Sequence, residues 1–230
     1  MRLGDCEFSQ QGCTVSLHRD GWDVEGSLRY SPLTPLHGDI MGPFRFLPME
    51  CSHGVGSLSH GVEGSLRING AHHTFHQGTG YIETDRGASF PRRYLWAQCG
   101  WQQQAPACVM VSVAEIPFLG ARFTGCIAAV LWQGQEYRFA TYQGVHIRRW
   151  GSGGVVLRQG RQELLVEPLE QASRPLQAPV RGTMTRIIRE APACTLRCQF
   201  CLDGHVVFDR VCPQSGFEYA DMAEDSFHFL

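Results

Sequence analysis

The sequence predicts an all-β protein built as a sandwich or a barrel, and two observations support this. Apolar and polar residues alternate with a period of two along most of the chain, and no stretch shows the apolar stripe of an amphipathic helix. Turn residues such as Asn69-Gly70 and Asp203-Gly204 interrupt these runs at short intervals. A closed or packed sheet hides its edges and can enclose one small apolar ligand.

Each expected strand is an alternating run that ends at a Gly, Pro, Asn or Asp turn. In chain order these runs cover residues 15–20, 22–30, 61–68, 107–116, 125–132, 136–142, 144–150, 155–159, 163–168, 184–190, 194–200 and 205–211. Residues 168–179 contain three prolines and are expected to form a loop. Pro43 and Pro48 exclude a regular central strand from residues 39–53, which fit either a loop over a barrel mouth or a buried crossover.

A short internal repeat supports a regular sheet. The hexapeptide VEGSLR occurs at residues 24–29 and again at residues 62–67. Two copies are too few for a solenoid or a propeller. Two equivalent strands of one sheet explain the repeat.

Composition excludes several classes of function. The 230 residues carry a net charge of −2 and no basic tract, which argues against nucleic acid as a partner. The absence of lysine excludes a lysine Schiff base and a P-loop. The first residues lack the apolar region of a secretory signal, and the longest apolar run, residues 126–132, is too short to cross a bilayer. We therefore expect a cytoplasmic protein without an integral membrane segment, whose ten cysteines are reduced.

Residues 80–99 are the most informative segment, because acids, arginines and aromatic rings lie together there around a Gly and a Pro. On a strand, Glu83 and Asp85 share one face, and their mutual repulsion favours one retained proton, which an acid catalyst needs. The alternative is a structural ion pair with a neighbouring arginine. Tyr94 and Trp96 also share a face, and they form either a ligand wall or part of the core.

Two patterns are typical of metal sites but lack the necessary context. The histidines of AHHTFH (residues 71–76) have no ligand partners at the spacing of zinc sites, so we expect surface histidines. The segment CTLRCQFC (residues 194–201) has the cysteine spacing of an iron–sulfur site but lies in an alternating strand. We expect neither a metal nor a cofactor.

The chain resembles the tocopherol cyclase-like family in four separated motifs that occur in the family's order. In the segment above, the matching residues are Gly80, Tyr81, Glu83, Gly87, Ser89, Phe90, Pro91, Tyr94, Trp96 and Gln98. The other motifs are DIMGPFRFLPMECSH at residues 39–53, SVAEIP at residues 112–117 and EYRFATYQGV at residues 136–145. The resemblance covers nearly the whole chain.

The resemblance implies a lipocalin-like fold of two antiparallel β-barrel or sandwich halves, which we place at residues 1–86 and 87–230. Members of the family generally open with a further segment of several strands, which this sequence does not show. Either the sequence is truncated or this member lacks those strands. In both cases we expect an incomplete first half with an unpaired edge.

The resemblance also implies a cofactor-free cyclase or isomerase. In such a reaction an acid protonates an alkene of a prenylated hydroquinone, and the phenolic oxygen captures the tertiary cation. The implied residues are Glu83 or Asp85 as the acid, His53 to orient the phenol, and Glu50, Tyr81, Arg86, Arg93, Tyr94 and Trp96 for substrate binding. Two alternatives stay open: a non-catalytic binder of a small hydrophobic or quinone-like molecule, and a hydratase that adds water to an isoprenoid alkene.

Overall fold

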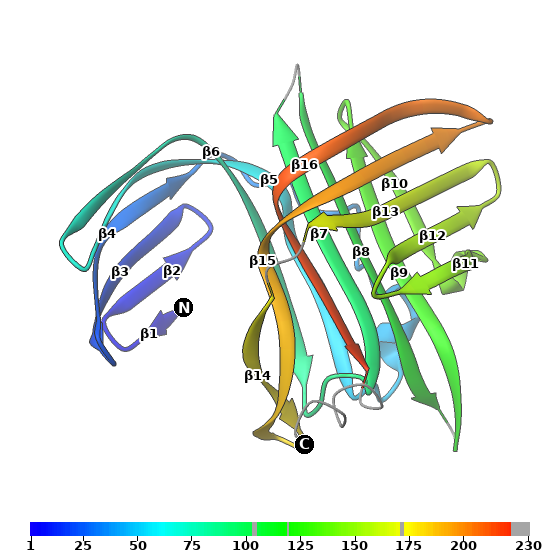
Figure 1. The fold of residues 1–230 in the computed structure, drawn as a ribbon, viewed down its shortest axis with the longest axis horizontal. Helices are drawn as coiled ribbons and strands as arrows, with labels where there is room; N and C mark the ends of the chain where they lie inside the picture. The colour runs from blue at the N-terminus through cyan, green and yellow to red at the C-terminus, as the bar shows by residue number, and fades with distance from the viewer. Residues whose placement is uncertain (103–104, 119, 171–172, 222–230) are drawn as a thin grey trace. The chain divides into compact units, whose positions relative to one another are not determined.

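The computed structural model describes residues 1–102, 105–118, 120–170 and 173–221. Two antiparallel sheets account for its strands (Figure 1), which confirms the predicted fold class. The first sheet has the order β1-β2-β3-β4-β5-β6. Its strands are β1 (Arg2–Leu3), β2 (Cys6–Ser9), β3 (Gly12–Arg19), β4 (Trp22–Tyr30), β5 (Cys51–Ile68) and β6 (Ala71–Gly87).

The second sheet has the order β10-β9-β8-β7-β16-β15-β13-β12-β11, and β14 pairs with β15 beside this path. Its strands are β7 (Arg93–Gln102), β8 (Pro106–Phe118), β9 (Ala121–Trp132), β10 (Gln135–Ala140), β11 (His146–Gly151), β12 (Gly154–Gln159), β13 (Gln162–Glu170), β14 (Arg174–Val180), β15 (Thr183–Leu202) and β16 (His205–Asp221). Two short 3₁₀ helices, η1 (Gly42–Phe46) and η2 (Thr141–Gln143), connect strands.

The chain divides into two compact units, which we call the N-terminal and the C-terminal unit. The N-terminal unit comprises Met1–Leu36 and Val55–Glu83, and the C-terminal unit comprises His37–Gly54 and Thr84–Leu230. Strands β5 and β6 therefore contribute residues to both units. The boundary after residue 86, which separates the two expected lipocalin-like halves, stays a prediction.

The VEGSLR repeat lies in two strands of one sheet, as the sequence indicated, and the structure shows that these strands are neighbours. Its first copy is in β4 and its second in β5, and the strands pair antiparallel so that Ser27 faces Ser65. Gly26 and Gly64 have φ angles of 145° and 138°. A Cβ atom on Gly26 would lie 2.2 Å from the carbonyl oxygen of Ser65, so the close approach of the two strands requires glycine.

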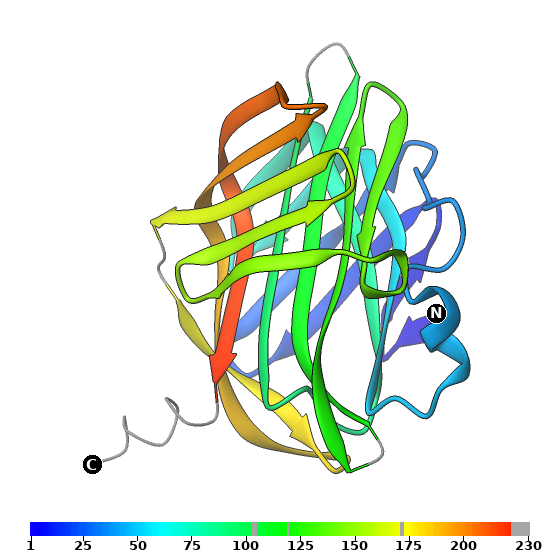
Figure 2. The same cartoon turned by 90° about the vertical axis from the view of Figure 1, so that its right-hand side faces the viewer.

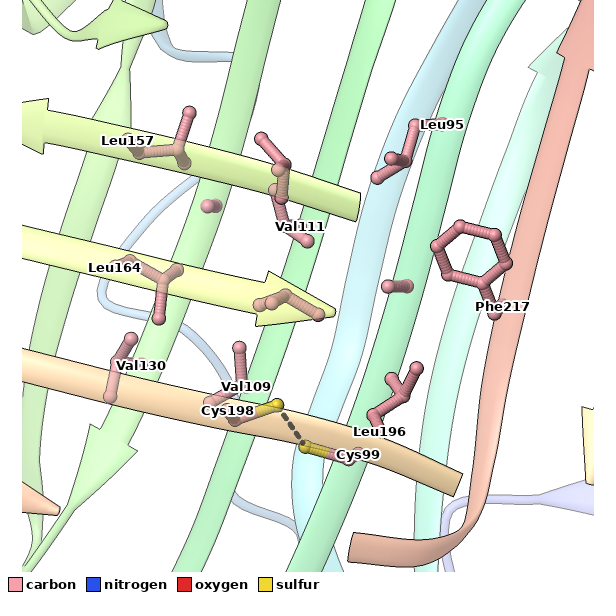
Figure 3. Packing of buried hydrophobic residues seen from close by; sticks show 14 of the residues in the cluster. Leu95, Cys99, Val109, Val111, Val130, Leu157, Leu164, Leu196, Cys198 and Phe217 are labelled. Atoms are coloured by element: carbon pink, nitrogen blue, oxygen red, sulfur yellow. Dashed lines mark hydrogen bonds between the residues drawn. The ribbon is translucent and has the colours of Figure 1, made fainter. Parts of the chain in front are cut away.

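The second sheet encloses the main hydrophobic core. In Figure 2, β11 to β13 cross in front of the long strands β7 to β9. Figure 3 shows Leu157 and Leu164 from β12 and β13 facing Val111 and Val130 from β8 and β9. All four side chains are at most 1% exposed. Because side chains alternate along a strand, each of these strands sends every second residue into this core.

The segment between β4 and β5 is held in place by β10 and η2. The guanidinium of Arg138 donates to the carbonyl oxygen of Asp39 at 2.8 Å, and the hydroxyl of Tyr142 donates to that of Ile40 at 3.0 Å. The ring of Tyr142 lies where a Cβ of Gly42 would be, so this turn requires glycine. As expected from Pro43, no strand forms around it, and η1 takes its place. The expectation fails only at residues 51–53, which follow Pro48 and already belong to β5.

The expectation of a loop over residues 168–179 is wrong. Strand β13 continues to Glu170, and β14 pairs with β15 from Arg174 to Val180. Proline is tolerated here because β14 is an edge strand, so Pro175 and Pro179 do not interrupt a ladder on a second side. Residues 171–172 lie outside the described part of the chain.

A buried histidine lies in the N-terminal unit. The side chain of His60 is on a residue only 4% exposed, and its Nδ1 lies 3.0 Å from Oγ of Ser57. The ring of Tyr30 lies against the imidazole, with centroids 4.7 Å apart. Burial lowers the pKa of His60, so the folded protein favours the neutral imidazole.

Replacement of Phe200 by alanine is expected to lower the free energy of unfolding by about 3–5 kcal/mol, because it leaves a cavity beside three other rings. Phe200 is fully buried and lies 4.9, 6.3 and 5.8 Å from the ring centroids of Tyr137, Phe139 and Phe208. Chemical denaturation followed by circular dichroism measures the change. In the matched control Val211→Ala, at a site 58% exposed, a change within about 0.5 kcal/mol is expected. Equal effects of both substitutions would contradict this core assignment.

Acid is expected to destabilise the protein partly through His60. Because the pKa of His60 is lowered in the folded state, the unfolded chain binds the proton more readily. The stabilisation of the folded state by neutral His60 is complete above the ordinary histidine pKa of about 6.5. It is lost as the pH falls toward the lowered pKa of the folded state. The midpoint of thermal unfolding should therefore fall less steeply with acidification in His60→Gln than in the wild type. His72→Gln, at an exposed site, should keep the wild-type slope, and an unchanged slope in His60→Gln would contradict the prediction.

Candidate functional site

His53 and Asp85 form a hydrogen-bonded pair in the C-terminal unit. Strands β5 and β6 are neighbours in their sheet, and the N–H of Ala88 donates to the carbonyl oxygen of Glu50 at 3.0 Å. This pairing brings Nδ1 of His53 to 2.9 Å from Oδ1 of Asp85. The side chain of His53 is 9% exposed and that of Asp85 is 36% exposed, so a buried ring orients a carboxyl group that solvent can reach.

Cys51 is the third member of this group. Its Sγ lies 3.7 Å from the same Oδ1 of Asp85. Burial, and then the charge of Asp85, raise the pKa of Cys51 to about 12, so the thiol stays protonated and donates. Within the described part of the chain, both side-chain contacts of Asp85 end on Oδ1, which leaves Oδ2 open to a bound molecule.

Glu83 has a different partner. Its Oε2 accepts a hydrogen bond of 2.8 Å from the hydroxyl of Tyr81, and both residues are partly buried. Both belong to the N-terminal unit, whereas Asp85 belongs to the C-terminal unit. The two carboxylates of β6 are thus each supplied with a donor of their own, a phenol for Glu83 and an imidazole for Asp85.

Tyr94 and Glu218 form a second pair in the C-terminal unit. The hydroxyl of Tyr94 donates to Oε2 of Glu218 at 2.9 Å, and Tyr94 is 6% exposed. Burial, followed by the charge of Glu218, raises the pKa of Tyr94 well above its ordinary value, so the phenol stays neutral and acts as a donor. The charge of Arg186 lowers the pKa of Tyr94 and the charge of Asp85 raises it, and both effects are smaller than that of burial.

Arg186 is the buried cation of this region. It is 8% exposed, and its guanidinium donates to the carbonyl oxygens of Pro91 and Arg92 at 2.8 and 3.0 Å. These bonds fix the chain directly before β7. The positive charge of Arg186 partly compensates the negative charges of Glu218 and Asp85.

Aromatic rings cover one face of this part of the sheet. Tyr94 and Trp96 share a face of β7, and the rings of Phe90 and Tyr94 meet edge to face with centroids 5.9 Å apart. The six-membered ring of Trp96 lies over Gly216, where a Cβ atom would come within 2.7 Å of it. Any other residue at position 216 would displace the indole.

Arg93 lies on the opposite face of β7 from Tyr94 and is held there by several groups. It forms ion pairs with Glu115 at 3.5 Å and Asp221 at 3.2 Å, and its guanidinium stacks 4.2 Å from the ring centre of Trp150. The structure therefore separates Arg93 from the other predicted residues of this strand.

Arg86 and Glu50 lie close to Asp85 along paired strands, and both are exposed. Glu50 contributes its backbone carbonyl to the strand pairing through the bond to Ala88. Both side chains are therefore accessible to a ligand at this end of β6.

Two hollows of about 440 and 510 Å³ lie in the N-terminal unit, and none of the predicted site residues lines either of them. Tyr30 lines the larger one, together with Pro32, Leu33 and Pro35.

Sequence reasoning missed Cys51, Arg186 and Glu218. Cys51 could have been found, because it lies two residues before His53 and so shares its face of a strand. Arg186 and Glu218 lie in β15 and β16, far along the chain from β7, and no local pattern relates them to Tyr94.

Among the described residues, no group of three or more His, Cys, Asp or Glu side chains has the arrangement of a metal site. The described helices are also all too short or too polar to span a membrane.

Comparisons with known proteins found one family profile and similar solved structures. The sequence profile described as tocopherol cyclase-like matches residues 42–218. The structure is similar to that of kievitone hydratase from Nectria haematococca, with a TM-score of 0.57 and 11% identity over 96% of this chain and 71% of that chain. A protein described as AttH from Nitrosomonas europaea is matched with a TM-score of 0.49 and 14% identity, over 96% of this chain and 69% of that chain. A search of curated proteins gave no match.

The likeness to kievitone hydratase concerns the fold alone, because the identity is only 11%. The family profile is more specific, since it spans most of the chain and includes His53, Asp85 and Tyr94. On this match, the protein belongs to the tocopherol cyclase-like family.

Proposed function

We propose that this protein is a cofactor-free cyclase of the tocopherol-cyclase type, which closes a ring in a prenylated hydroquinone by acid catalysis. The observation that carries the proposal is the carboxyl group of Asp85. Its Oδ1 is held by His53 and Cys51, while Oδ2 accepts no described hydrogen bond. A carboxylic acid held at one oxygen can present the O–H of the other to a substrate.

The proposed reaction is an isomerisation, so it needs no co-reactant. The proton on Oδ2 of Asp85 moves to an alkene carbon of the prenyl tail, which leaves a tertiary cation and a carboxylate. The phenolic oxygen of the substrate then attacks the cation, a C–O bond forms, and the phenolic proton returns to Asp85. Between the two steps, His53 stabilises the carboxylate through its 2.9 Å hydrogen bond.

Electron-rich rings are the second requirement of this chemistry. An indole face that is shielded from water stabilises a cation by about 2 kcal/mol. Trp96 and Tyr94 supply such faces in the C-terminal unit, and the neutral hydroxyl of Tyr94 adds no competing negative charge of its own. This arrangement supports a role for both residues in substrate binding.

The remaining candidates have less support. Glu83 is the alternative acid, and its bond to Tyr81 is the counterpart of the bond between His53 and Asp85. Arg86 and Glu50 are exposed and suit a polar head group. The ion pairs of Arg93 make it the weakest candidate of the predicted set.

The substitution Asp85→Asn is expected to lower the rate of cyclisation by about 100-fold or more, because the amide cannot supply the proton. The assay is incubation with a prenyl hydroquinone and detection of a ring-closed product of unchanged mass. Glu83→Gln is the matched control, with an expected loss of less than about tenfold. If both variants kept the wild-type rate, the assignment of the acid would be wrong. Loss in Glu83→Gln alone would transfer the role to Glu83.

The substitution Trp96→Phe is expected to lower kcat about tenfold with little change in KM, because the smaller ring stabilises the cation less than indole does. Trp96→Leu should lower kcat further, since it removes the π face and keeps apolar volume. Equal kcat values in the wild type and in Trp96→Leu would show that the indole does not face the cation.

Product mass separates the alternatives. One solved structure with a similar fold is named as a hydratase, and a hydratase would use the same acid with water in place of the phenol. A product heavier by one water would favour that reaction. Retention of the hydroquinone without conversion would favour the non-catalytic binder.

A further inference from the structure

The larger hollow of the N-terminal unit, of about 510 Å³, has an apolar wall, and we call it the Tyr30 hollow. This wall consists of Tyr30 at the end of β4 and of Pro32, Leu33 and Pro35, which follow that strand. Small-molecule sites in proteins have volumes of about 300–1,000 Å³, so the hollow has the size of such a site. Its lining residues all precede residue 42, where the family match begins, except Gly56. The wall therefore belongs to the part of the chain outside that match.

The chain that forms this wall is fixed to β5 at two points. The N–H of Ser31 donates to the carbonyl oxygen of Gly61 at 3.0 Å, and the N–H of Leu58 donates to the carbonyl oxygen of Thr34 at 2.8 Å. The two prolines of the segment have fixed φ angles. A wall that is already ordered loses little conformational entropy when a ligand binds to it.

The ring of Tyr30 is also supported on the protein side. It packs against the buried imidazole of His60, with centroids 4.7 Å apart. The backbone N–H of Tyr30 donates to the carbonyl oxygen of Gln11 at 2.8 Å, which joins the turn between β2 and β3 to the hollow. The flat faces of a phenol and of two pyrrolidine rings favour a flat ring as their partner.

The polar groups of the hollow are neutral. Gln10 and Gln11 line it with exposed side chains, and within the described residues neither side-chain amide takes part in a hydrogen bond. Each amide offers both a donor and an acceptor. The lining residues that the structure describes carry no charge at neutral pH. A charged ligand would lose hydration without gaining a partner of opposite charge, so the hollow favours a neutral one.

We propose that the Tyr30 hollow is a binding site for a neutral, flat aromatic molecule that carries carbonyl or hydroxyl groups. The rings of Tyr30, Pro32 and Pro35 contact the faces of the ligand, and the amides of Gln10 and Gln11 bind its polar groups. The inference does not depend on the proposed cyclase activity, because Asp85 belongs to the C-terminal unit and does not line the hollow.

The test is a titration of the ¹⁵N-labelled full chain with 7-methoxycoumarin, a neutral flat ring with a carbonyl group, followed by ¹H–¹⁵N correlation spectra. We expect saturable shifts of the backbone N–H of Leu33 and of the side-chain amides of Gln10 and Gln11. A molecule of this size should bind with a Kd of about 0.1–1 mM. The matched anion, 7-methoxycoumarin-4-acetate, should bind at least about tenfold more weakly, because the hollow offers no positive charge.

The substitution Leu33→Glu should weaken the binding of 7-methoxycoumarin at least about tenfold, because it places a carboxylate in the apolar wall. The matched control is Phe8→Glu, which changes the lining of the smaller hollow in the same unit and should keep the wild-type Kd. Circular dichroism verifies that each variant is folded, and if Leu33→Glu is not, the wild-type spectra decide alone.

Three results would overturn the proposal. The first is the absence of saturable shifts in the wild type, or shifts confined to the C-terminal unit. The second is equal affinity for the neutral coumarin and its anion. The third is an unchanged Kd in folded Leu33→Glu. None of these results bears on the acid site, since cyclisation is measured with a different molecule and through Asp85.

Discussion

The alternation of side chains across hydrogen-bonded strands is the constraint on which the rest of this structure depends. Strand β7 shows it most clearly. Leu95, Ala97 and Cys99 point into the core of the second sheet, while Tyr94 and Trp96 on the other face meet residues of β16. A shift of the register by one residue would exchange these two sets, so the apolar core and the polar contacts of Tyr94 are specified together.

For the polar groups near the candidate acid, hydrogen bonds compensate the cost of burial. Asp85 accepts from His53, Tyr94 donates to Glu218, and Arg186 donates to backbone carbonyls. Each bond offsets the cost of removing a polar group from water. Because these groups already have partners, the proposal assigns the new bond with a substrate to Oδ2 of Asp85, which accepts no described hydrogen bond.

The sequence determined the features that depend on local periodicity. Alternation and turn residues were sufficient for the all-β class, the internal repeat placed the two VEGSLR strands in one sheet, and Pro43 was sufficient for the absence of a strand around it. The motif around Asp85 was sufficient for the family. The prolines after residue 168 misled, because a local rule cannot tell an edge strand, where proline is tolerated, from a loop.

Only the tertiary structure decided which distant residues meet. His53 and Asp85 are 32 residues apart, Cys99 and Cys198 are 99 apart, and Tyr94 and Glu218 are 124 apart. The alternation with a period of two indicates which face of a strand a residue occupies. It does not indicate which strand lies beside that strand or in which register the two pair. The order and register of the strands follow from packing the whole core, and they decide which partners each reactive group meets.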